Sequence, residues 1–378
     1  MNLFSKLLSP KSKRRKVRYA VVGMGNFAQT AILPAFANAA DRAELTALVT
    51  GDTEKATKLS RKYDVPVYGY EDYSKLLDSG TVDAVYIAVP NSEHRKFAES
   101  AARAGKHVLC EKPLAYTVQD AQAMVDTCRK AKVYLMTAYR LHFEDGNLDA
   151  IKKIRSGKIG EARLFTSVHT MQIDFDNTRT DLSLGGGPLE DIGIYCINAA
   201  RYVFQAEPEE VTAFAVRGKD RRFKEIPEAV SATLHFSGGR LASFVCGFGT
   251  TKVSEYRVIG TEGVLKMDPA YTWHGEIEQT LLRKTRSKTR IFKHRDQVAA
   301  ELVYFSDCIL TKKEPEPSGR EGLIDVRILE ALRTSYTKNR TVRIKLPAKK
   351  QRPSVTQSIV RKPPKKPKPI KADPPSRE

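Results

Sequence analysis

Short apolar runs alternate with helical patterns over the first part of the chain. Runs rich in β-branched residues, which predict strands, are Val17–Val22, Leu45–Val49, Ala84–Val89, His107–Leu109 and Val133–Thr137. Between them, apolar residues recur at helical spacing near residues 27–40, 53–63, 93–104 and 117–131. Nearly continuous apolar strands separated by helices of this length are typical of a parallel sheet buried on both faces. We therefore predict repeated strand–helix–strand units up to about residue 145.

The pattern changes beyond that point. A helix is predicted over about 187–204, and Gly238-Gly239 marks a hairpin turn. Two more helical patterns, about 297–311 and 320–337, precede a last strand near 341–346. Strand-like runs lie near residues 211–217, 229–236, 240–248, 252–260 and 263–267. Strands that follow each other at hairpin spacing predict an open, mostly antiparallel sheet.

The positive charge lies mostly at the two ends of the chain. Of the formal net charge of +20, residues 1–18 contribute +7 and residues 347–378 contribute +8, which leaves +5 for residues 19–346. This distribution argues against a nucleic-acid-binding core. No apolar run reaches the roughly 20 residues that span a bilayer, and the basic arm 1–16, expected to be flexible, lacks the features of a secretory signal. Five widely spaced cysteines without a CxxC pair predict no zinc site or disulfide framework, so we expect a cytoplasmic protein.

Two basic segments need an interpretation of their own. Residues 347–378 contain eight of the 19 prolines, and such a composition buries too little surface to offset the entropy of ordering. We predict a disordered tail, partly polyproline II, which leaves open a weak contact with an acidic partner. Specific nucleic-acid recognition is not expected without interleaved aromatic residues. Arg283–Arg295 predicts the edge of a hairpin, where lysines discourage aggregation, or else a docking surface for an acidic partner.

The first predicted strand leads directly into GMGNFA, a G-x-G-x-x-A motif at residues 23–28. Gly23 permits the tight turn, Gly25 lets the backbone approach a pyrophosphate, and Ala28 allows close packing of the helix on the strand. Unpaired N–H groups at the N-terminus of the following helix favour anions. The turn, with Asn26 and Phe27 between these residues, is the predicted binding site for a dinucleotide.

The end of the next strand bears on which dinucleotide binds. An NAD-preferring site places Asp or Glu there to accept from the ribose 2′-hydroxyl, whereas this run is Thr50-Gly51-Asp52, followed by Lys55 and Lys58. Thr50 and Lys55 suit a 2′-phosphate, while Asp52 works against one. We expect NADP in preference to NAD.

Candidate catalytic residues come from two further segments. Lys112 lies in CEKP after a predicted strand, and ligands of a doubly wound sheet bind beyond the carboxyl ends of its strands. Asp191 and Tyr195 lie four residues apart in GGGPLEDIGIY and share one face of a predicted helix. A tyrosine is a poor base near neutral pH unless a nearby cation favours the phenolate, and Lys112 would supply that cation. The alternative is structural, a carboxylate near a helix N-terminus and a core tyrosine.

These segments together resemble the glucose–fructose oxidoreductase / inositol dehydrogenase / MocA (Gfo/Idh/MocA) family of NAD(P)-dependent oxidoreductases, and most of all its glucose–fructose oxidoreductase branch. The resemblance covers residues 17–346. It implies an α/β fold in which an N-terminal Rossmann dinucleotide-binding domain (17–145) joins a C-terminal α+β domain (146–346) with an open, mostly antiparallel sheet. The segments that carry it are GMGNFA, VPNSEH at 89–94, CEKP at 110–113, YRLHF at 139–143, GGGPLEDIGIY at 185–195 and EGLIDVRILEAL at 321–332.

The resemblance also implies residue roles. Asp191 binds substrate and Tyr195 is the acid/base. Glu111 and Lys112 lie beside the nicotinamide ribose, and Lys112 also reaches the reacting hydroxyl. Further cofactor-pocket positions are Asn91, His94 and Arg140, with Tyr73 near the adenosine end. The Lys112–Pro113 bond is often cis in the family. The substrate is expected to be a cyclic sugar or polyol, the assembly a homodimer or homotetramer, and no metal is implied.

Two features depart from the family pattern. Glu190 replaces the usual apolar residue before the Asp and would add a carboxylate at the edge of the site. Residues 173–184 lack a frequent Trp-Arg pair, and Arg179 is expected to replace it as a substrate-binding residue, one position out of register. The competing function is a non-catalytic, dinucleotide-sensing regulator of the same fold, but the joint presence of Lys112, Asp191 and Tyr195 favours an enzyme.

Overall fold

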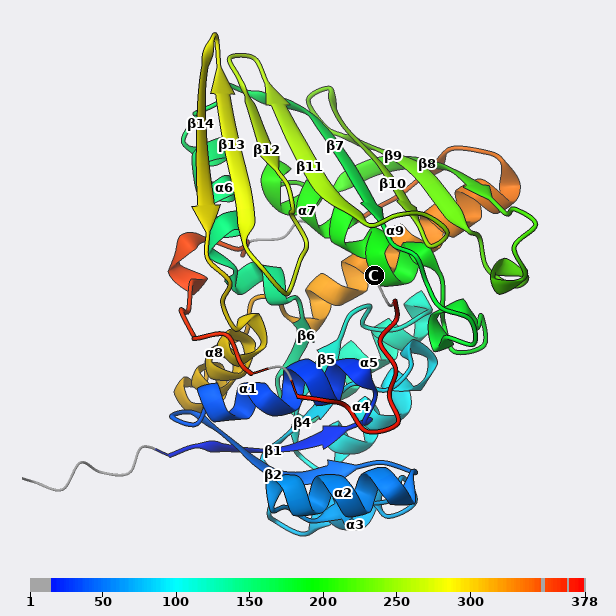
Figure 1. Cartoon of the computed structure of the whole chain (residues 1–378), viewed down its shortest axis with the longest axis vertical. Helices are drawn as coiled ribbons and strands as arrows, with labels where there is room; N and C mark the ends of the chain where they lie inside the picture. Colours follow the sequence, from blue (N-terminus) through cyan, green and yellow to red (C-terminus); the bar gives the residue numbers. More distant parts are fainter. Residues whose placement is uncertain (1–14, 348–350, 366, 377–378) are drawn as a thin grey trace, which may run out of the picture.

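The computed structural model describes residues 15–347, 351–365 and 367–376. The N-terminal part forms a six-stranded parallel sheet in the order β3-β2-β1-β4-β5-β6 (Figure 1). Because the chain winds away from β1 in both directions, a crevice for a ligand opens beyond the carboxyl ends of β1 and β4. The strands are β1 (Val17–Val22), β2 (Ala43–Val49), β3 (Val67–Tyr68), β4 (Ala84–Ile87), β5 (His107–Glu111) and β6 (Leu135–Ala138).

Helices cover both faces of this sheet. In β1, Tyr19 and Val21 pack on one side against η1, α1 and α8, whereas Ala20 and Val22 pack on the other side against α3, α4 and α5. Both faces are therefore buried, as the continuous apolar strands predict. The helical elements are η1 (Ala28–Ile32), α1 (Leu33–Asn38), α2 (Thr53–Tyr63), α3 (Tyr73–Asp78), α4 (His94–Arg103), α5 (Val118–Lys130) and α8 (Gln297–Thr311).

The C-terminal part is built on a nine-stranded sheet in the order β14-β13-β12-β11-β7-β10-β9-β8-β15. Among the described strands of this second sheet only β7 and β10 pair in parallel, so the predicted mostly antiparallel sheet is confirmed. The strands are β7 (Ala162–Thr170), β8 (Pro208–Val216), β9 (Ala229–Phe236), β10 (Arg240–Gly247), β11 (Val253–Gly260), β12 (Val264–Met267), β13 (Ile277–Arg283), β14 (Arg286–Phe292) and β15 (Val342–Arg343).

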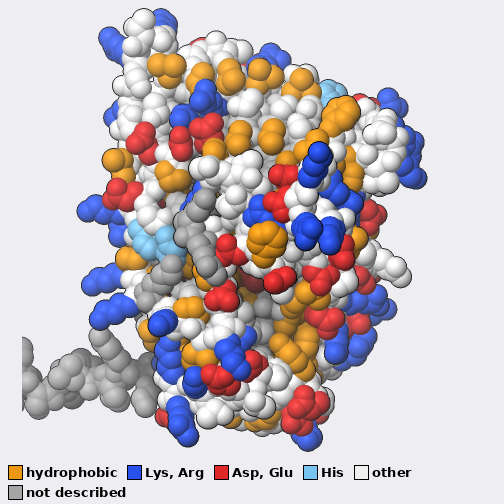
Figure 2. Space-filling view, turned by 45° about the vertical axis from the view of Figure 1, so that its right-hand side comes forward, with side chains coloured by type: hydrophobic (Ala, Val, Ile, Leu, Met, Phe, Trp, Pro, Cys, Tyr) orange, Lys and Arg blue, Asp and Glu red, His pale blue; other side chains and the backbone are white. Residues whose placement is uncertain are grey.

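Helices pack on one face of the large sheet and leave the other open (Figure 1). The open face carries exposed apolar residues such as Phe214, Leu241 and Val245, and Figure 2 shows apolar side chains scattered over the part of the surface that the sheet forms. The helical elements of this part are α6 (Asp145–Arg155), η5 (Leu189–Gly193), α7 (Ile194–Phe204) and α9 (Gly319–Lys338).

The structure differs from the sequence-based picture in three places. The prediction lacks α3, α6, β3, β7 and β13. In the central strand β7, exposed apolar residues such as Leu164 obscure the alternation. The helix α8 follows the second sheet in the chain but packs into the Rossmann core. The spacing of apolar residues in α8 predicts that one face of the helix is buried, but it does not predict which of the two sheets that face packs against.

The third difference concerns the C-terminal segment. The sequence predicts a disordered tail over 347–378, yet the described residues 351–365 and 367–376 lie against both domains and make hydrogen bonds with them. The composition predicts correctly that this segment forms no hydrophobic core of its own. It does not reveal that polar side chains of the Rossmann domain bind the backbone of the segment. The expected flexible arm 1–16 lies outside the described residues except for its last two.

Three other features bear on the class of protein. No helix in the described part of the chain is long and apolar enough to cross a membrane. All five cysteines are buried and free. Nowhere among the described residues do three or more His, Cys, Asp or Glu side chains gather as a metal site.

Candidate active site

The glycine-rich turn follows β1 at the crevice between β1 and β4. Gly23 has φ +95°, and a Cβ added there would lie 2.6 Å from the Ala88 carbonyl oxygen, so only glycine fits. Gly25 is exposed, and an added Cβ would meet no atom within 4 Å. Ala28 is 1% exposed and begins η1. The backbone at Gly25 thus faces open space beside a helix start, which fits a dinucleotide pyrophosphate.

The loop after β2 forms the end of the crevice where the motif would place the adenosine ribose. Thr50 is nearly buried, and its N–H donates to the Tyr68 carbonyl at 3.0 Å. Asp52 accepts from the Lys55 N–H at 2.9 Å and caps α2, which gives this carboxylate a structural task. A Cβ on Gly51 would lie 3.2 Å from the Tyr70 ring, so Tyr70 is the aromatic residue beside this loop.

Two of the expected cofactor positions, Tyr73 and His94, are buried in the structure. Tyr73 is 5% exposed in the core, where its hydroxyl donates to the Phe97 carbonyl at 3.3 Å. Because α3 begins at Tyr73 and turns that ring inward, Tyr70 rather than Tyr73 lies beside the loop at Gly51. His94 is fully buried, with its ring nitrogens at 3.0 Å from the carbonyls of Pro113 and Val89. Burial lowers the pKa of His94 although the backbone carbonyls act against that shift, and the one N–H of a neutral ring can donate to only one of these two carbonyls.

The other cofactor-pocket positions lie between the domains. Asn91 donates to the Gly185 carbonyl at 2.8 Å and so joins the Rossmann domain to the triple-glycine turn. Tyr86 donates its hydroxyl to Glu111 at 2.8 Å, and burial raises the pKa of Glu111. Phe27 packs against Trp273 with ring centroids 5.4 Å apart. The contacts of Asn91 and Phe27 cross the domain boundary, whereas the Tyr86–Glu111 hydrogen bond lies within the Rossmann domain.

Lys112, Asp191 and Arg179 converge from two domains. Lys112 Nζ lies 2.6 Å from the Asp191 carbonyl oxygen and 3.1 Å from its Oδ1, and Arg179 Nε lies 2.8 Å from Asp191 Oδ2. Burial acts to raise the pKa of Asp191, but the charges of Arg179 and Lys112 outweigh it and hold that pKa well below its usual range. Burial also acts against a charged Lys112, yet Asp191, Tyr195 and Glu111 raise its pKa. The Lys112–Pro113 bond is cis.

Two cations lie close to the ring of Tyr195. Lys112 Nζ and the Arg140 guanidinium carbon are each 4.9 Å from the centroid of its ring. Arg140 also donates from Nε to the Tyr195 hydroxyl oxygen at 3.3 Å and is itself held by the carbonyl of Thr272 at 3.1 Å. The phenolic O–H stays available as a donor, since no described residue accepts from it. The predicted grouping of Lys112, Asp191 and Tyr195 is thus present in the geometry.

His169 is a candidate residue that the sequence does not reveal. It lies on β7, with ring centroids 4.9 Å from Tyr271 and 5.6 Å from Tyr195, and its Nδ1 is 3.2 Å from the Ile192 carbonyl. Burial lowers the pKa of His169 to about 3, so the ring is neutral and donates to that carbonyl. A recognisable strand pattern over 162–170 would have placed it, but the exposed apolar residues of β7 hide that pattern.

Glu190 does not lie at the edge of the site as expected. Its side chain is 4% exposed and pairs with Arg333 of α9 at 2.8 Å. Burial raises the pKa of Glu190 although Arg333 acts against that shift. Arg333 also donates to the Tyr116 carbonyl at 2.7 Å. Glu190 therefore ties the start of the helix that carries Asp191 to α9.

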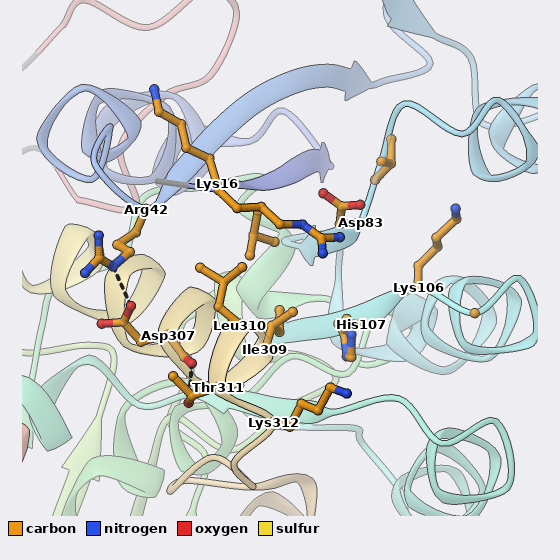
Figure 3. A pocket seen from close by; sticks show the side chains of 14 residues that line it. Lys16, Arg42, Asp83, Lys106, His107, Asp307, Ile309, Leu310, Thr311 and Lys312 are labelled. Carbon is orange, nitrogen blue, oxygen red and sulfur yellow. Dashed lines mark hydrogen bonds and ion pairs between the residues drawn. The ribbon is translucent and has the colours of Figure 1, made fainter. Parts of the chain in front are cut away.

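A separate hollow of about 630 Å³ opens at the other end of the Rossmann sheet. Lys16, Lys106 and Lys312 line it, and Arg42 there pairs with Asp307 at 2.5 Å (Figure 3). It adjoins the start of β1 and β5 rather than their carboxyl ends, and no candidate catalytic residue lines it. The candidate catalytic residues lie instead at the crevice between the domains.

Comparison with known proteins agrees with this geometry. Residues 17–139 match the model of an oxidoreductase family with an NAD-binding Rossmann fold, and residues 147–266 match the model of the GFO/IDH/MocA C-terminal domain. The chain is 33% identical to a D-xylose 1-dehydrogenase [NADP(+)] of Haloarcula marismortui over 87% of this chain and 93% of that protein.

Solved structures give the same result. An aldose-aldose oxidoreductase from Caulobacter crescentus, complexed with glycerol, is 39% identical with a TM-score of 0.83 and covers 87% of this chain and 100% of its own. A 3-ketoreductase from Actinomadura kijaniata in complex with NADP and TDP-benzene is 26% identical with a TM-score of 0.78, covering 85% and 98%. The chain belongs to the Gfo/Idh/MocA family and is an NAD(P)-dependent oxidoreductase that acts on CH-OH groups.

Proposed function

We propose that the protein transfers hydride between NADP and a cyclic sugar or polyol. The observation that carries the proposal is the convergence of Lys112, Asp191 and Tyr195, from two domains, at the crevice next to the glycine-rich turn. A sugar presents several hydroxyls, and the donors and acceptors of Asp191, Arg179 and His169 suit such a ligand. The sugar substrates named for the xylose dehydrogenase and the aldose-aldose oxidoreductase support the same class.

The choice of NADP rests on two arguments. Thr50 and Lys55 suit a 2′-phosphate, and Asp52 is engaged as the cap of α2. The xylose dehydrogenase is named for NADP(+), and the 3-ketoreductase structure contains NADP. When bound, the nicotinamide supplies the hydride donor or acceptor.

The chain's own residues would handle the proton. In the reductive direction Tyr195 donates its phenolic proton to the carbonyl oxygen of the sugar, while the carbonyl carbon receives the hydride. Lys112 and Arg140 flank the ring at 4.9 Å and stabilise the negative charge left on the tyrosine oxygen. Asp191, fixed by Lys112 and Arg179, accepts from a neighbouring hydroxyl and orients the sugar. Oxidation reverses these steps.

The test is a substrate screen. Purified protein is incubated with NADP⁺ or NAD⁺ and a panel of aldoses and polyols, and formation of the reduced nicotinamide is followed by absorbance. We expect turnover with at least one cyclic sugar, and a loss of about 10²–10⁴-fold in Tyr195→Phe, which keeps the ring but removes the proton. Full turnover of Tyr195→Phe contradicts the assigned role, and inactivity on the whole panel contradicts the substrate class.

The proposal includes a homodimer or homotetramer. The exposed apolar side chains on the open face of the large sheet, among them Phe214 (68% exposed) and Val216 (61%), support association through that face. Light scattering on the purified chain measures the mass directly, and a monomer at micromolar concentration contradicts this part.

A further inference from the structure

The C-terminal segment, here the residues 351–365 and 367–376, runs across the Rossmann domain beside α1 and ends between the two domains (Figure 1). Its first part is anchored at several points. Gln357 donates to the Glu316 carbonyl at 2.8 Å, Asn38 donates to the Lys362 carbonyl at 3.0 Å, and Arg361 pairs with Asp41 at 3.0 Å. These contacts carry the chain past α1 to the glycine-rich turn.

The last part of the segment lies on the dinucleotide turn itself. The Gln29 amide, 2% exposed, makes two hydrogen bonds with the backbone of Ile370, one in each direction, at 2.8 and 3.0 Å. Asn26, inside the G-x-G-x-x-A motif, donates to the Ala372 carbonyl at 2.8 Å. A buried amide that pairs both polar groups of one residue is a specific site for the segment rather than an incidental surface contact.

These contacts place Lys371 at the loop that the sequence assigns to the ribose. Its Nζ lies 2.6 Å from Glu54 on the first turn of α2. Hydrogen bonds from Lys371 and Lys58 lower the pKa of Glu54 to about 2, so this carboxylate is charged. Lys371 also has φ +44°, a conformation that is unfavourable for a non-glycine residue and that the hydrogen bonds of its two neighbours maintain.

The charges of this loop explain why the lysine matters. Asp52 and Glu54 are balanced by Lys55 and Lys58, so without the C-terminal segment the loop has no net positive charge to attract a 2′-phosphate. Asp373 offsets the formal charge of Lys371 within residues 370–375, but it is the Lys371 ammonium that lies at Glu54. An ammonium group with three donors can bind Glu54 and a phosphate oxygen together.

The segment then crosses to the second domain. The Asp174 N–H donates to the Pro375 carbonyl at 3.0 Å, in the loop that leads to Arg179. The ten residues 367–376 include four prolines, which restrict the chain and reduce the entropy lost on ordering. From Glu54 past Asn26 to Asp174, the segment follows the expected length of the dinucleotide crevice.

We propose that residues 370–375 form a third part of the dinucleotide site, in which Lys371 selects the 2′-phosphate of NADP over the 2′-hydroxyl of NAD and the segment retains the bound cofactor. This inference rests on the proposed function. The aldose-aldose oxidoreductase aligns over its whole length with 87% of this chain, so this chain carries residues that the relative lacks.

The experiment compares three full-length proteins, namely wild type, Lys371→Gln and Lys368→Gln, with a shortened chain that ends at Lys365. Binding of NADPH and NADH is followed by energy transfer from the single tryptophan, Trp273, which packs on Phe27 of the turn. We expect Lys371→Gln to weaken NADPH binding about tenfold while NADH binding changes less than twofold, because only the phosphate interacts with the lost charge. Lys368→Gln, for which no ion pair is seen in the described part of the chain, should bind like wild type.

The shortened chain tests retention. We expect it to release NADPH at least tenfold faster than wild type in a chase with excess NADP⁺. Equal weakening of NADPH and NADH in Lys371→Gln, or no change in either, overturns the selection role. If the shortened chain binds NADPH more tightly than wild type, the segment competes with the cofactor, and the proposal is overturned.

The point variant keeps the proposal testable if the shortened chain fails to fold. Failure of the proposed function has a different signature, since the wild-type chain itself would then bind no NADPH or reduce no sugar.

Discussion

One group of buried charges in this protein joins the two domains at the crevice. Lys112, Asp191 and Arg179 form it, and their side chains are 12%, 20% and 31% exposed. Lys112 and Arg179 share the single carboxylate of Asp191. Lys112 also contacts the Tyr195 ring, whose centroid lies 4.9 Å from Nζ. Part of each side chain is open to a ligand.

A second group lies in the core of the C-terminal domain. Arg201, 1% exposed, pairs with Glu321 at 2.7 Å, with Asp325 at 2.6 Å and with Glu207 at 2.5 Å. Burial acts against the charge, but the three carboxylates raise the pKa of Arg201 well above its usual value. Tyr139 donates its hydroxyl to Asp325 at 2.5 Å and completes the network.

The two groups of charged residues differ in whether a ligand can reach them. Both combine burial, close ion pairs and shifted pKa values, which are common signs of function. Only the first leaves donors and an aromatic hydroxyl open to a crevice that adjoins a cofactor site. The second is closed on every side by its own chain. Burial of charge therefore marks both stability and chemistry, and access to a ligand separates them.

The largest expected effect comes from Lys112→Met. We expect turnover to fall by about 10³-fold or more, because Tyr195 loses the cation that stabilises negative charge on its oxygen. Asp191 keeps its pair with Arg179, so no buried charge is stranded and the melting temperature should stay within a few degrees. The control is Lys75→Met, whose side chain is 77% exposed. If Lys112→Met turns over near the wild-type rate, the Lys112 group has no role in the reaction and does not differ in function from the Arg201 group.

The matching change in the core is Arg201→Met. It leaves Glu207, Glu321 and Asp325 without their shared cation, and a broken buried network of this kind costs about 3–5 kcal/mol of unfolding free energy. Urea denaturation measures the loss. The folded fraction should keep its turnover number, since no group at the crevice is altered. A large fall in turnover per folded molecule, with stability unchanged, would contradict a purely structural role.

Much of this comparison is visible in the sequence, and some of it is not. The glycine turn, Lys112, Asp191 and Tyr195 follow from local spacing, because each is fixed by its own strand end or helix face. His169, Tyr70 and Arg201 depend on how distant elements pack, and no local pattern distinguishes a core arginine from a surface one. The burial of Tyr73 depends on packing in the same way, since the helix that starts at that residue turns its ring into the core.

A smaller effect, confined to acid, is expected for His169. Its pKa is about 3 in the folded protein, against about 6.5 when unfolded. Because the unfolded chain binds the proton first, stability falls as the pH drops from about 6.5 towards 3, by about 2 kcal/mol at pH 5. Asp191, Arg140 and Lys112 also contribute to the field at this ring. His169→Gln should remove that part of the pH dependence in denaturation curves at pH 7 and pH 5, and an identical slope in both proteins would contradict it.

The smallest expected effect links the core group to the C-terminal segment. Arg352 pairs with Glu207 at 2.7 Å with its side chain 11% exposed, so it shares a carboxylate with Arg201. We expect Arg352→Gln to lower the unfolding free energy by about 1–2 kcal/mol, because Glu207 keeps one of its two partners. Arg343→Gln is the matched control: Arg343 pairs with Glu210 at the same 2.7 Å, but its side chain is 90% exposed and solvent screens the pair. Equal denaturation midpoints for both variants would show that the segment adds nothing to the core network, and a loss confined to Arg352→Gln would show that the core network extends into the C-terminal segment.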